Sequence, residues 1–502
     1  MSGKSSTVEA PEQARTNRPV AKATKVGFVS LGCPKNLVDS EVMMGMLQQA
    51  GAELTPHADE ADVIVVNTCS FIDRAQRESV DAILDLARQK AAGGIKKLVV
   101  AGCLVERYRE EIQKNIPEVD AVVGTGELEN ILDATGLRTY PAEAELAQGT
   151  SSPFVILQSR PEAVARTQQG RFSREYWHGA IADLPNYLYD DTTPRVLATP
   201  KYSAYIKIAE GCDHPCSFCI IPQLRGKFRS RRFESVIAEA ERLARSGVRE
   251  ITLIGQDTTC YGEDLGLKDG LALLLEKLAR IADLRWIRFL YAYPNKITGR
   301  LLETIAAHEN ICSYIDVPLQ HASASALKRM KRGGGAEVFL RSIEKMRRTI
   351  PDLTLRTSFI VGFPGETEQE FEELCDFVRE IRFDWMGTFG YSDEEGSPAH
   401  ALEGKLPVRE IERRRKRLMR IQQQISKKRK KALIGKEFDL LLEGPSEETE
   451  LLLEGRTAMH APEIDGKVFV NVVPEDRDVE TGQFYRCEIT EAHDYDLIAK
   501  II

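Results

Sequence analysis

A short apolar run followed by a turn and a helical segment recurs along most of this chain, and this alternation restricts the possible folds more than any other feature. In the first part, each run precedes a stretch with the periodicity of an amphipathic helix. The three units are 26–31 with 36–49, 62–66 with 74–89, and 97–100 with 105–115. Strands that alternate with helices predict βαβ units with right-handed crossovers. We therefore expect a Rossmann-like parallel sheet in an N-terminal domain of residues 25–140.

The same alternation resumes in a longer domain, residues 200–435. Its six apolar strand candidates are 205–209, 250–254, 286–291, 314–317, 355–361 and 385–391. Six units are too few for a closed eight-stranded barrel, so the sequence predicts a partial (β/α)6 barrel in an α/β multidomain chain. Distinctive residues follow these strands, among them Gln256, Tyr293, Gln320 and His321. Because active sites of such barrels lie at the carboxyl ends of the strands, we expect the site there.

Three cysteines follow the three N-terminal strands within a few residues. They are Cys33, Cys69 and Cys103. A single cysteine at a strand end is most simply a small buried residue. Three in the same position favour a shared role, because the carboxyl ends of parallel strands lie along one edge of the sheet, where such sheets bind ligands. The pattern indicates a metal centre with three protein ligands.

A second group, Cys212, Cys216 and Cys219, lies close together in sequence after the first barrel strand. The chain has only 10 cysteines in 502 residues, too few for a disulfide scaffold. Zinc sites and iron-sulfur clusters usually take four protein ligands, so three thiolates leave one metal position open. An open position indicates catalysis. The other four cysteines lack partners at useful spacing, and we interpret them as ordinary residues: Cys260, Cys312, Cys375 and Cys487.

The charge of the chain is divided unevenly. Residues 436–502 contain six Lys or Arg and seventeen Asp or Glu, a net charge of -11, so the remainder carries +3 of the total of -8. Alternating runs at 437–442, 467–472 and 485–491 predict a small antiparallel β-barrel there. A domain this acidic repels a phosphate backbone and attracts basic proteins. We interpret the basic helix 409–431 as a solvated linker in preference to a nucleic-acid contact.

Two segments lack a clear period. Residues 1–24 are rich in small, polar and charged residues and predict a disordered tail, and residues 141–199 predict an insertion or linker. No apolar run approaches the roughly 18 residues that span a bilayer, and the N-terminus does not resemble a signal peptide. We therefore expect a cytoplasmic protein without a membrane partner.

The spacing C-x3-C-x2-C at 212–219 resembles the signature of radical S-adenosylmethionine (SAM) enzymes. From about residue 25 to 502, the chain further resembles the methylthiotransferases of that superfamily, and most of all the type that modifies an aspartate of ribosomal protein twelve of the small subunit. The matching strings are VSLGCPKN at 29–36, AEGC at 209–212, LIGQDTT at 253–259, YAYP at 291–294, PLQHA at 318–322 and IVGFPGET at 360–367. The resemblance implies a radical SAM domain at 200–435 and a TRAM barrel at 436–502.

The resemblance also implies the chemistry. Cys212, Cys216 and Cys219 would hold a 4Fe-4S cluster whose open iron binds SAM, and the other three cysteines would hold a second 4Fe-4S cluster that presents the sulfur. Candidate cofactor contacts are Gln256, Gln320, Arg356, Gly362 and Glu366. The radical formed from SAM would remove hydrogen from the β-carbon of the substrate aspartate. The resemblance assigns no acid-base catalytic residue. It implies an electron donor such as a flavodoxin or ferredoxin, and a monomer.

Two alternatives remain open: the same chemistry on transfer RNA, favoured by the basic helix, and a zinc-stabilised ribosome-binding protein without enzymatic activity. Tyr293 and His321 are equally suited to orienting a substrate or to packing. The chain departs from the family pattern at His460, which replaces an acidic residue before 461–466, and in its long linker.

Overall fold

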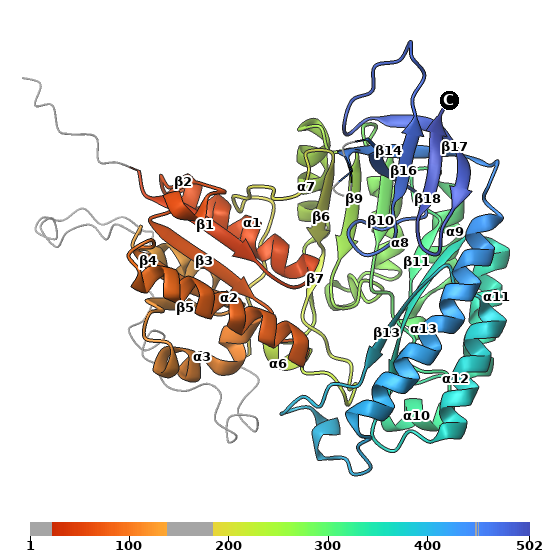
Figure 1. The fold of residues 1–502 in the computed structure, drawn as a ribbon, viewed down its shortest axis with the longest axis horizontal. Helices are drawn as coiled ribbons and strands as arrows, with labels where there is room; N and C mark the ends of the chain where they lie inside the picture. The colour runs from red at the N-terminus through yellow and green to blue at the C-terminus, as the bar shows by residue number, and fades with distance from the viewer. Residues whose placement is uncertain (1–22, 138–183, 447–448, 450) are drawn as a thin grey trace, which may run out of the picture.

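A computed structural model describes residues 23–137, 184–446, 449 and 451–502 (Figure 1). Residues 1–22 of the predicted tail and most of the predicted linker lie outside these residues. The described chain forms an N-terminal sheet, a larger barrel and a small C-terminal barrel. Among the described helices, none is both long and apolar enough to cross a membrane.

The N-terminal domain is a five-stranded parallel sheet in the order β2-β1-β3-β4-β5. Its strands are β1 (Lys25–Ser30), β2 (Glu53–Leu54), β3 (Val63–Thr68), β4 (Lys97–Gly102) and β5 (Ala121–Val123). The helices are α1 (Pro34–Gln49), α2 (Asp73–Ala91), α3 (Cys103–Asn115) and α4 (Ile131–Thr135). All six residues of β3 are buried, as expected for a central strand covered on both faces. The predicted parallel sheet is confirmed.

The large barrel contains six parallel strands in two hydrogen-bonded sheets, β10-β9-β6 and β11-β12-β13. They are β6 (Ser203–Lys207), β9 (Glu250–Ile254), β10 (Trp286–Phe289), β11 (Tyr314–Asp316), β12 (Thr354–Val361) and β13 (Trp385–Gly390). The longer helices are α7 (Phe233–Arg245), α8 (Gly270–Leu278), α9 (Gly299–Ala307), α11 (Ala336–Thr349) and α12 (Glu368–Ile381). Short elements are β7 (Ala209–Glu210), α6 (Ile221–Arg225), β8 (Arg229–Ser230) and α10 (Ala324–Arg329). The predicted six-stranded partial barrel is confirmed.

The basic segment forms the long helix α13 (Val408–Lys431), which runs along the outside of the large barrel in Figure 1. It leads into a closed barrel of five strands in the order β14-β15-β16-β18-β17. These are β14 (Glu437–Pro445), β15 (Leu453–Thr457), β16 (Val468–Val472), β17 (Phe484–Ala492) and β18 (Leu497–Ile501). The predicted small barrel is confirmed, although the sequence did not reveal β15 or β18.

The C-terminal barrel packs against the starts of the large barrel's strands. Glu250, Tyr314 and Trp385 are the first residues of β9, β11 and β13. Arg456 pairs with Glu250 at 2.7 Å, the Tyr314 hydroxyl donates to Asp465 at 2.6 Å, and the Trp385 indole donates to the Met459 carbonyl at 2.7 Å. Because the strands are parallel, the small barrel closes the end opposite their carboxyl ends.

His460 is fully buried in this junction. Its ring packs against Trp385 with centroids 5.3 Å apart, and its Nδ1 lies 2.9 Å from the Thr457 hydroxyl. Burial lowers the pKa of His460 well below its usual value, so the ring is neutral. The departure from the family pattern is therefore a packing residue between two domains.

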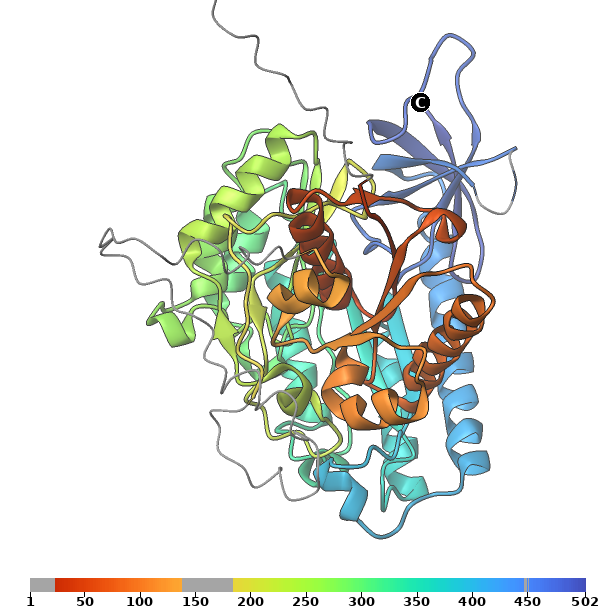
Figure 2. The same cartoon turned by 90° about the vertical axis from the view of Figure 1, so that its left-hand side faces the viewer.

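The described part of the linker, residues 184–199, lies between the first two domains. Arg195 is buried there and pairs with Glu41 of α1 at 2.8 Å and with Glu239 of α7 at 2.6 Å. Figure 2 shows the N-terminal sheet in front of the large barrel. This segment thus ties the N-terminal domain to the barrel through buried ion pairs.

Candidate active site between two cysteine triplets

The structure brings Cys33, Cys69 and Cys103, hereafter the sheet triplet, to one edge of the N-terminal sheet. Cys69 and Cys103 come directly after β3 and β4, and Cys33 follows the last residue of β1, Ser30, after a short turn. Gly32 adopts a positive φ of 94°, and a Cβ placed on it would lie 2.6 Å from the Cβ of Cys69. Only glycine allows this close approach. Burial raises the pKa of Cys103 to about 12; the charge of Arg225 opposes this shift, and those of Cys69 and Cys33 reinforce it.

Cys212, Cys216 and Cys219, hereafter the barrel triplet, lie in one loop between β7 and α6. Backbone contacts hold this loop: the Cys219 N–H donates to the Cys216 carbonyl at 3.2 Å, and the Ser217 N–H donates to Met330 at 3.0 Å. Burial raises the pKa of Cys219 to about 12, although the Ile221 N–H that donates to its sulfur lowers it.

Both triplets have the donor chemistry of an iron-sulfur site. Each offers three thiols, and each receives one arginine hydrogen bond at 3.4 Å, from Arg225 to the Cys103 sulfur and from Arg332 to the Cys216 sulfur. Hydrogen bonds to the sulfurs and burial are the means by which proteins tune such clusters. The residues present therefore fit a cluster with one open iron at each triplet.

A ring stack supports the loop of the barrel triplet. His214 stacks on Tyr293 with centroids 3.8 Å apart, and its Nε2 lies 2.6 Å from Asp257. Asp257 also accepts from the Cys260 thiol at 3.1 Å, and the interpretation of Cys260 as an ordinary residue stays a prediction. The potential ligand atoms of His214, Asp257 and Cys260 lie within 4.8 Å of one another, and hydrogen bonds account for this grouping. Tyr293 packs between two side chains: His214 stacks on its ring, and the guanidinium carbon of Arg332 lies 4.5 Å from the ring centre.

Four of the candidate cofactor contacts follow strands at the carboxyl end of the barrel. Gln256 donates to Glu210 at 2.6 Å, and its Oε1 is buried without a hydrogen-bond partner among the described residues. Gln320 has a positive φ of 72°. Glu366 accepts from the N–H groups of Gly362 at 2.6 Å and Phe363 at 3.2 Å. Their contacts to SAM stay predictions.

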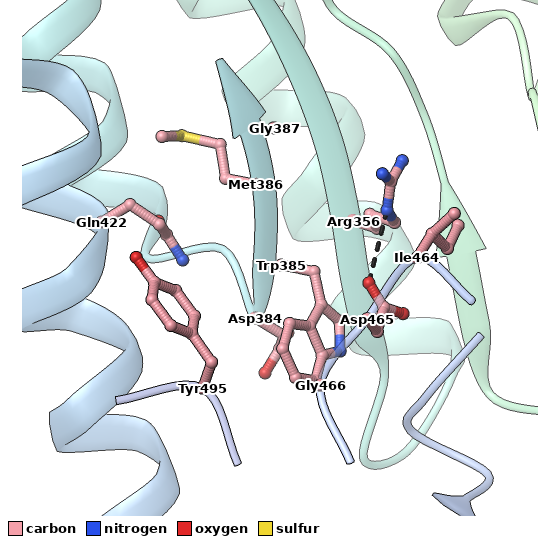
Figure 3. A pocket seen from close by; sticks show the side chains of 10 residues that line it. All are labelled: Arg356, Asp384, Trp385, Met386, Gly387, Gln422, Ile464, Asp465, Gly466 and Tyr495. Atoms are coloured by element: carbon pink, nitrogen blue, oxygen red, sulfur yellow. Dashed lines mark ion pairs between the residues drawn. The ribbon is translucent and has the colours of Figure 1, made fainter. Parts of the chain in front are cut away.

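Arg356 lies elsewhere. It is the third residue of β12, and it pairs with Asp316 at 2.8 Å and with Asp465 of the C-terminal barrel at 3.4 Å. A cavity of about 310 Å³ between the two barrels and α13 is lined by Arg356, Trp385 and Asp465 (Figure 3). His321 is fully buried, and its Nδ1 accepts from the Ser323 N–H at 3.0 Å. A contact between Arg356 and the cofactor stays a prediction. In the structure, the ion pairs of Arg356 with Asp316 and Asp465 connect the large barrel to the C-terminal barrel.

The sequence did not reveal the contacts that join the triplets' two domains. Lys35 of α1 places its ammonium 3.3 Å from the ring centre of Tyr291, which follows β10 and has a positive φ of 65°. Lys207 and Glu210 of the barrel form a buried network with Asp39 of α1. Lysine and aspartate in a helix normally predict a solvated face, so only the three-dimensional arrangement identifies these contacts.

Known protein families match all three domains. The family described as "Uncharacterized protein family UPF0004" matches residues 25–124. The radical SAM superfamily matches residues 206–378, and the TRAM domain matches residues 434–502. A solved radical SAM methyltransferase, TsrM from Kitasatospora setae, has a TM-score of 0.48 and 15% identity, covering 73% of this chain and 72% of that one. So weak a likeness says nothing of function.

Fold and barrel triplet together define a radical SAM enzyme with an additional N-terminal domain and a TRAM barrel. Proteins named ribosomal protein uS12 methylthiotransferase RimO are 70% identical over 97% of this chain in Koribacter versatilis and 55% identical over 95% in Solibacter usitatus. The matches cover 98% and 95% of those relatives. The chain belongs to the RimO family of methylthiotransferases.

Proposed function

We propose that this chain adds a methylthio group to the β-carbon of an aspartate in ribosomal protein uS12. The relatives' names give the enzyme class and the substrate protein. The observation that carries the proposal is the pair of thiol triplets at the junction of the N-terminal sheet and the barrel, linked through Arg225. A single triplet would explain SAM cleavage alone, whereas adding sulfur as well requires a second centre.

The six cysteines would hold two 4Fe-4S clusters, and SAM would bind at the barrel triplet. When bound, these groups supply one-electron chemistry and the sulfur atom. The chain's own residues hold and shield them. Arg332 donates to Cys216, and the Oε1 of Gln256, which has no hydrogen-bond partner among the described residues, offers an acceptor at the carboxyl end of the barrel. The C-terminal barrel closes the other end through contacts with the first residues of β9, β11 and β13.

The acidity of the C-terminal barrel supports the proposal that the substrate is a basic protein. Its net charge of -11 favours association with a basic ribosomal protein and disfavours free RNA. Neutralising Glu447, Glu448 and Glu450 should weaken capture at low salt more than at high salt. These three residues lie outside the described part of the chain. An unchanged affinity at every salt concentration contradicts this steering.

Several details belong to the same proposal. The domain boundaries are 25–140, 200–435 and 436–502, with the segment 141–199 as the connection. The enzyme works in the cytoplasm as a monomer and receives electrons from a flavodoxin or ferredoxin. Reduced thiols and a ribosomal substrate support this location.

Mass spectrometry tests the function directly. Purified uS12 and transfer RNA are each incubated with the anaerobically reconstituted enzyme, SAM, reductant and sulfide. We expect a methylthio mass increase on an aspartate-containing peptide of uS12. An increase only on RNA would establish the transfer-RNA alternative, and a colourless protein with zinc in place of iron would establish the scaffold alternative. The comparisons support neither.

A further inference from the structure

Arg225 connects the two triplets physically. It is the last residue of α6, six residues after Cys219, yet its side chain points into the N-terminal domain. The guanidinium is buried and donates to Asp39 of α1 at 2.5 Å, to the Asn36 side chain at 2.9 Å and to the Cys103 sulfur at 3.4 Å. The helix that follows one triplet therefore supplies a hydrogen-bond donor to the other.

The surrounding charges leave Arg225 available to Cys103. Asp39 and Glu210 are the two carboxylates of this buried network, and Lys207 pairs with both, at 2.5 Å to Glu210. Arg225 bonds both carboxylates through Nη1, with Glu210 at 3.3 Å, which leaves Nη2 to donate to the Asn36 side chain and the Cys103 sulfur. The planar fork of arginine holds its donors to Asp39 and to the Cys103 sulfur in fixed directions, whereas a lysine ammonium is a flexible point charge.

We infer that Arg225 is a positioning residue of the second centre, whose hydrogen bond stabilises the reduced form of the cluster held by the sheet triplet. The inference rests on the proposed function, since it requires a cluster at that triplet. A positive donor withdraws electron density from the thiolate sulfur and raises the reduction potential. The potential of the second centre therefore depends on the docking of the loop that carries the first.

The experiment uses the full chain with Cys212, Cys216 and Cys219 all replaced by alanine, so that only the sheet triplet binds iron. Into this background we introduce Arg225→Met, which removes both the charge and the hydrogen-bond donor to the Cys103 sulfur. A second version combines Arg225→Met with Asp39→Asn, which preserves the charge balance if the single change fails to fold. The midpoint potential is measured by a redox titration followed by electron paramagnetic resonance. We expect it to fall by about 59 mV, a tenfold change for one electron.

Arg332→Met is the matched control, because Arg332 donates to Cys216, which is absent from this background. It should leave the potential unchanged. In the reverse background, with Cys33, Cys69 and Cys103 replaced, the effects should exchange: Arg332→Met lowers the potential, and the Arg225 variants do not. Retained iron with an unchanged potential in both Arg225 versions overturns the inference. A background protein without iron overturns the proposed second centre itself, and the inference with it.

Discussion

The two cysteine triplets offer the same set of three thiols on different supports. One loop carries the barrel triplet within eight residues, 212–219, whereas the sheet triplet is assembled from strand ends spread over 33–103. The loop is held by local turns, by contacts to residues 329–332 and by the stack of His214 on Tyr293. The sheet triplet needs correct pairing of β1, β3 and β4. A site encoded in a loop is therefore robust and visible in sequence, while one encoded in a sheet depends on the whole domain.

The largest effect should come from removing one ligand of each triplet. Cys216→Ala should abolish both SAM cleavage and methylthio transfer, whereas Cys103→Ala should abolish transfer and leave SAM cleavage. Each variant should lose about half of the roughly eight irons expected for two clusters. Iron analysis and chromatography of the SAM products measure these outcomes. Cys375→Ala, at a buried position of α12, should retain all the iron. Methylthio transfer by the Cys103 variant would contradict a separate role for the sheet triplet.

A glycine substitution should separate the two supports. Gly32→Ala places a methyl group 2.6 Å from the Cys69 Cβ, so we expect the sheet triplet to lose its iron, about half of the total. Gly51→Ala is the matched control. Gly51 has nearly the same φ, 93°, but nothing lies within 4 Å of its added Cβ. It should cost about 1 kcal/mol of backbone strain and no iron. Equal iron in both variants contradicts the crowding argument.

Docking of the N-terminal domain should depend on the buried bridge at Arg195. Arg195→Met leaves Glu41 without its cation and Glu239 with only Arg231, and should cost about 3 kcal/mol of unfolding free energy in a denaturant titration. Arg88→Met, which removes a pair on the solvent-exposed face of α2, should change stability by less than about 0.5 kcal/mol. Similar losses from the two variants would show that the bridge is not important for docking.

The smallest effect concerns acid. Burial alone would raise the pKa of Glu370. Hydrogen bonds from Arg329, Ser325 and the Thr367 backbone outweigh burial and lower this pKa from 4.5 to about 2. A depressed pKa contributes stability above pH 4.5 that is lost as the pH falls from about 4.5 to about 2. The Arg329 carbonyl accepts from Ser217 of the barrel triplet's loop, so acid should loosen this loop.

Glu370→Gln should therefore lower stability at pH 7 by about 1 kcal/mol and flatten the acid dependence, as followed by thermal unfolding at several pH values. Glu373→Gln, on the exposed side of the same helix, serves as the control. An acid dependence that is the same in both variants would remove Glu370 as its cause.

Much of the fold could be predicted because the strands are long apolar runs. The predicted strand 250–254 coincides with β9, and the predicted helix 409–431 differs from α13 by one residue. The strand β15 was missed because its polar residues Glu454 and Arg456 are buried in ion pairs and break the expected alternation. Tertiary pairing here overrides the local pattern.

The ligand triplets could be predicted, but their surroundings could not. Arg225 and Arg231 lie in a basic stretch that looks solvent-exposed in sequence, and both are buried against carboxylates. Asp39, the partner of Arg225, is 186 residues away in the chain. No periodicity connects residues so distant, so the network that joins the two triplets emerges only from the folded arrangement.

The docking of the C-terminal barrel has a consequence for the order of synthesis. Glu250, Tyr314 and Trp385 bond to residues 206, 151 and 74 positions later in the chain. Domains generally fold as they leave the ribosome, N-terminal first. Here Glu250, which also pairs with Arg288 of the same barrel at 3.4 Å, is translated before its closer partner Arg456. The end of the large barrel where its strands begin is therefore covered last. A ribosome that stalls before the final domain leaves a chain that has both cysteine triplets but whose large barrel is uncovered at that end.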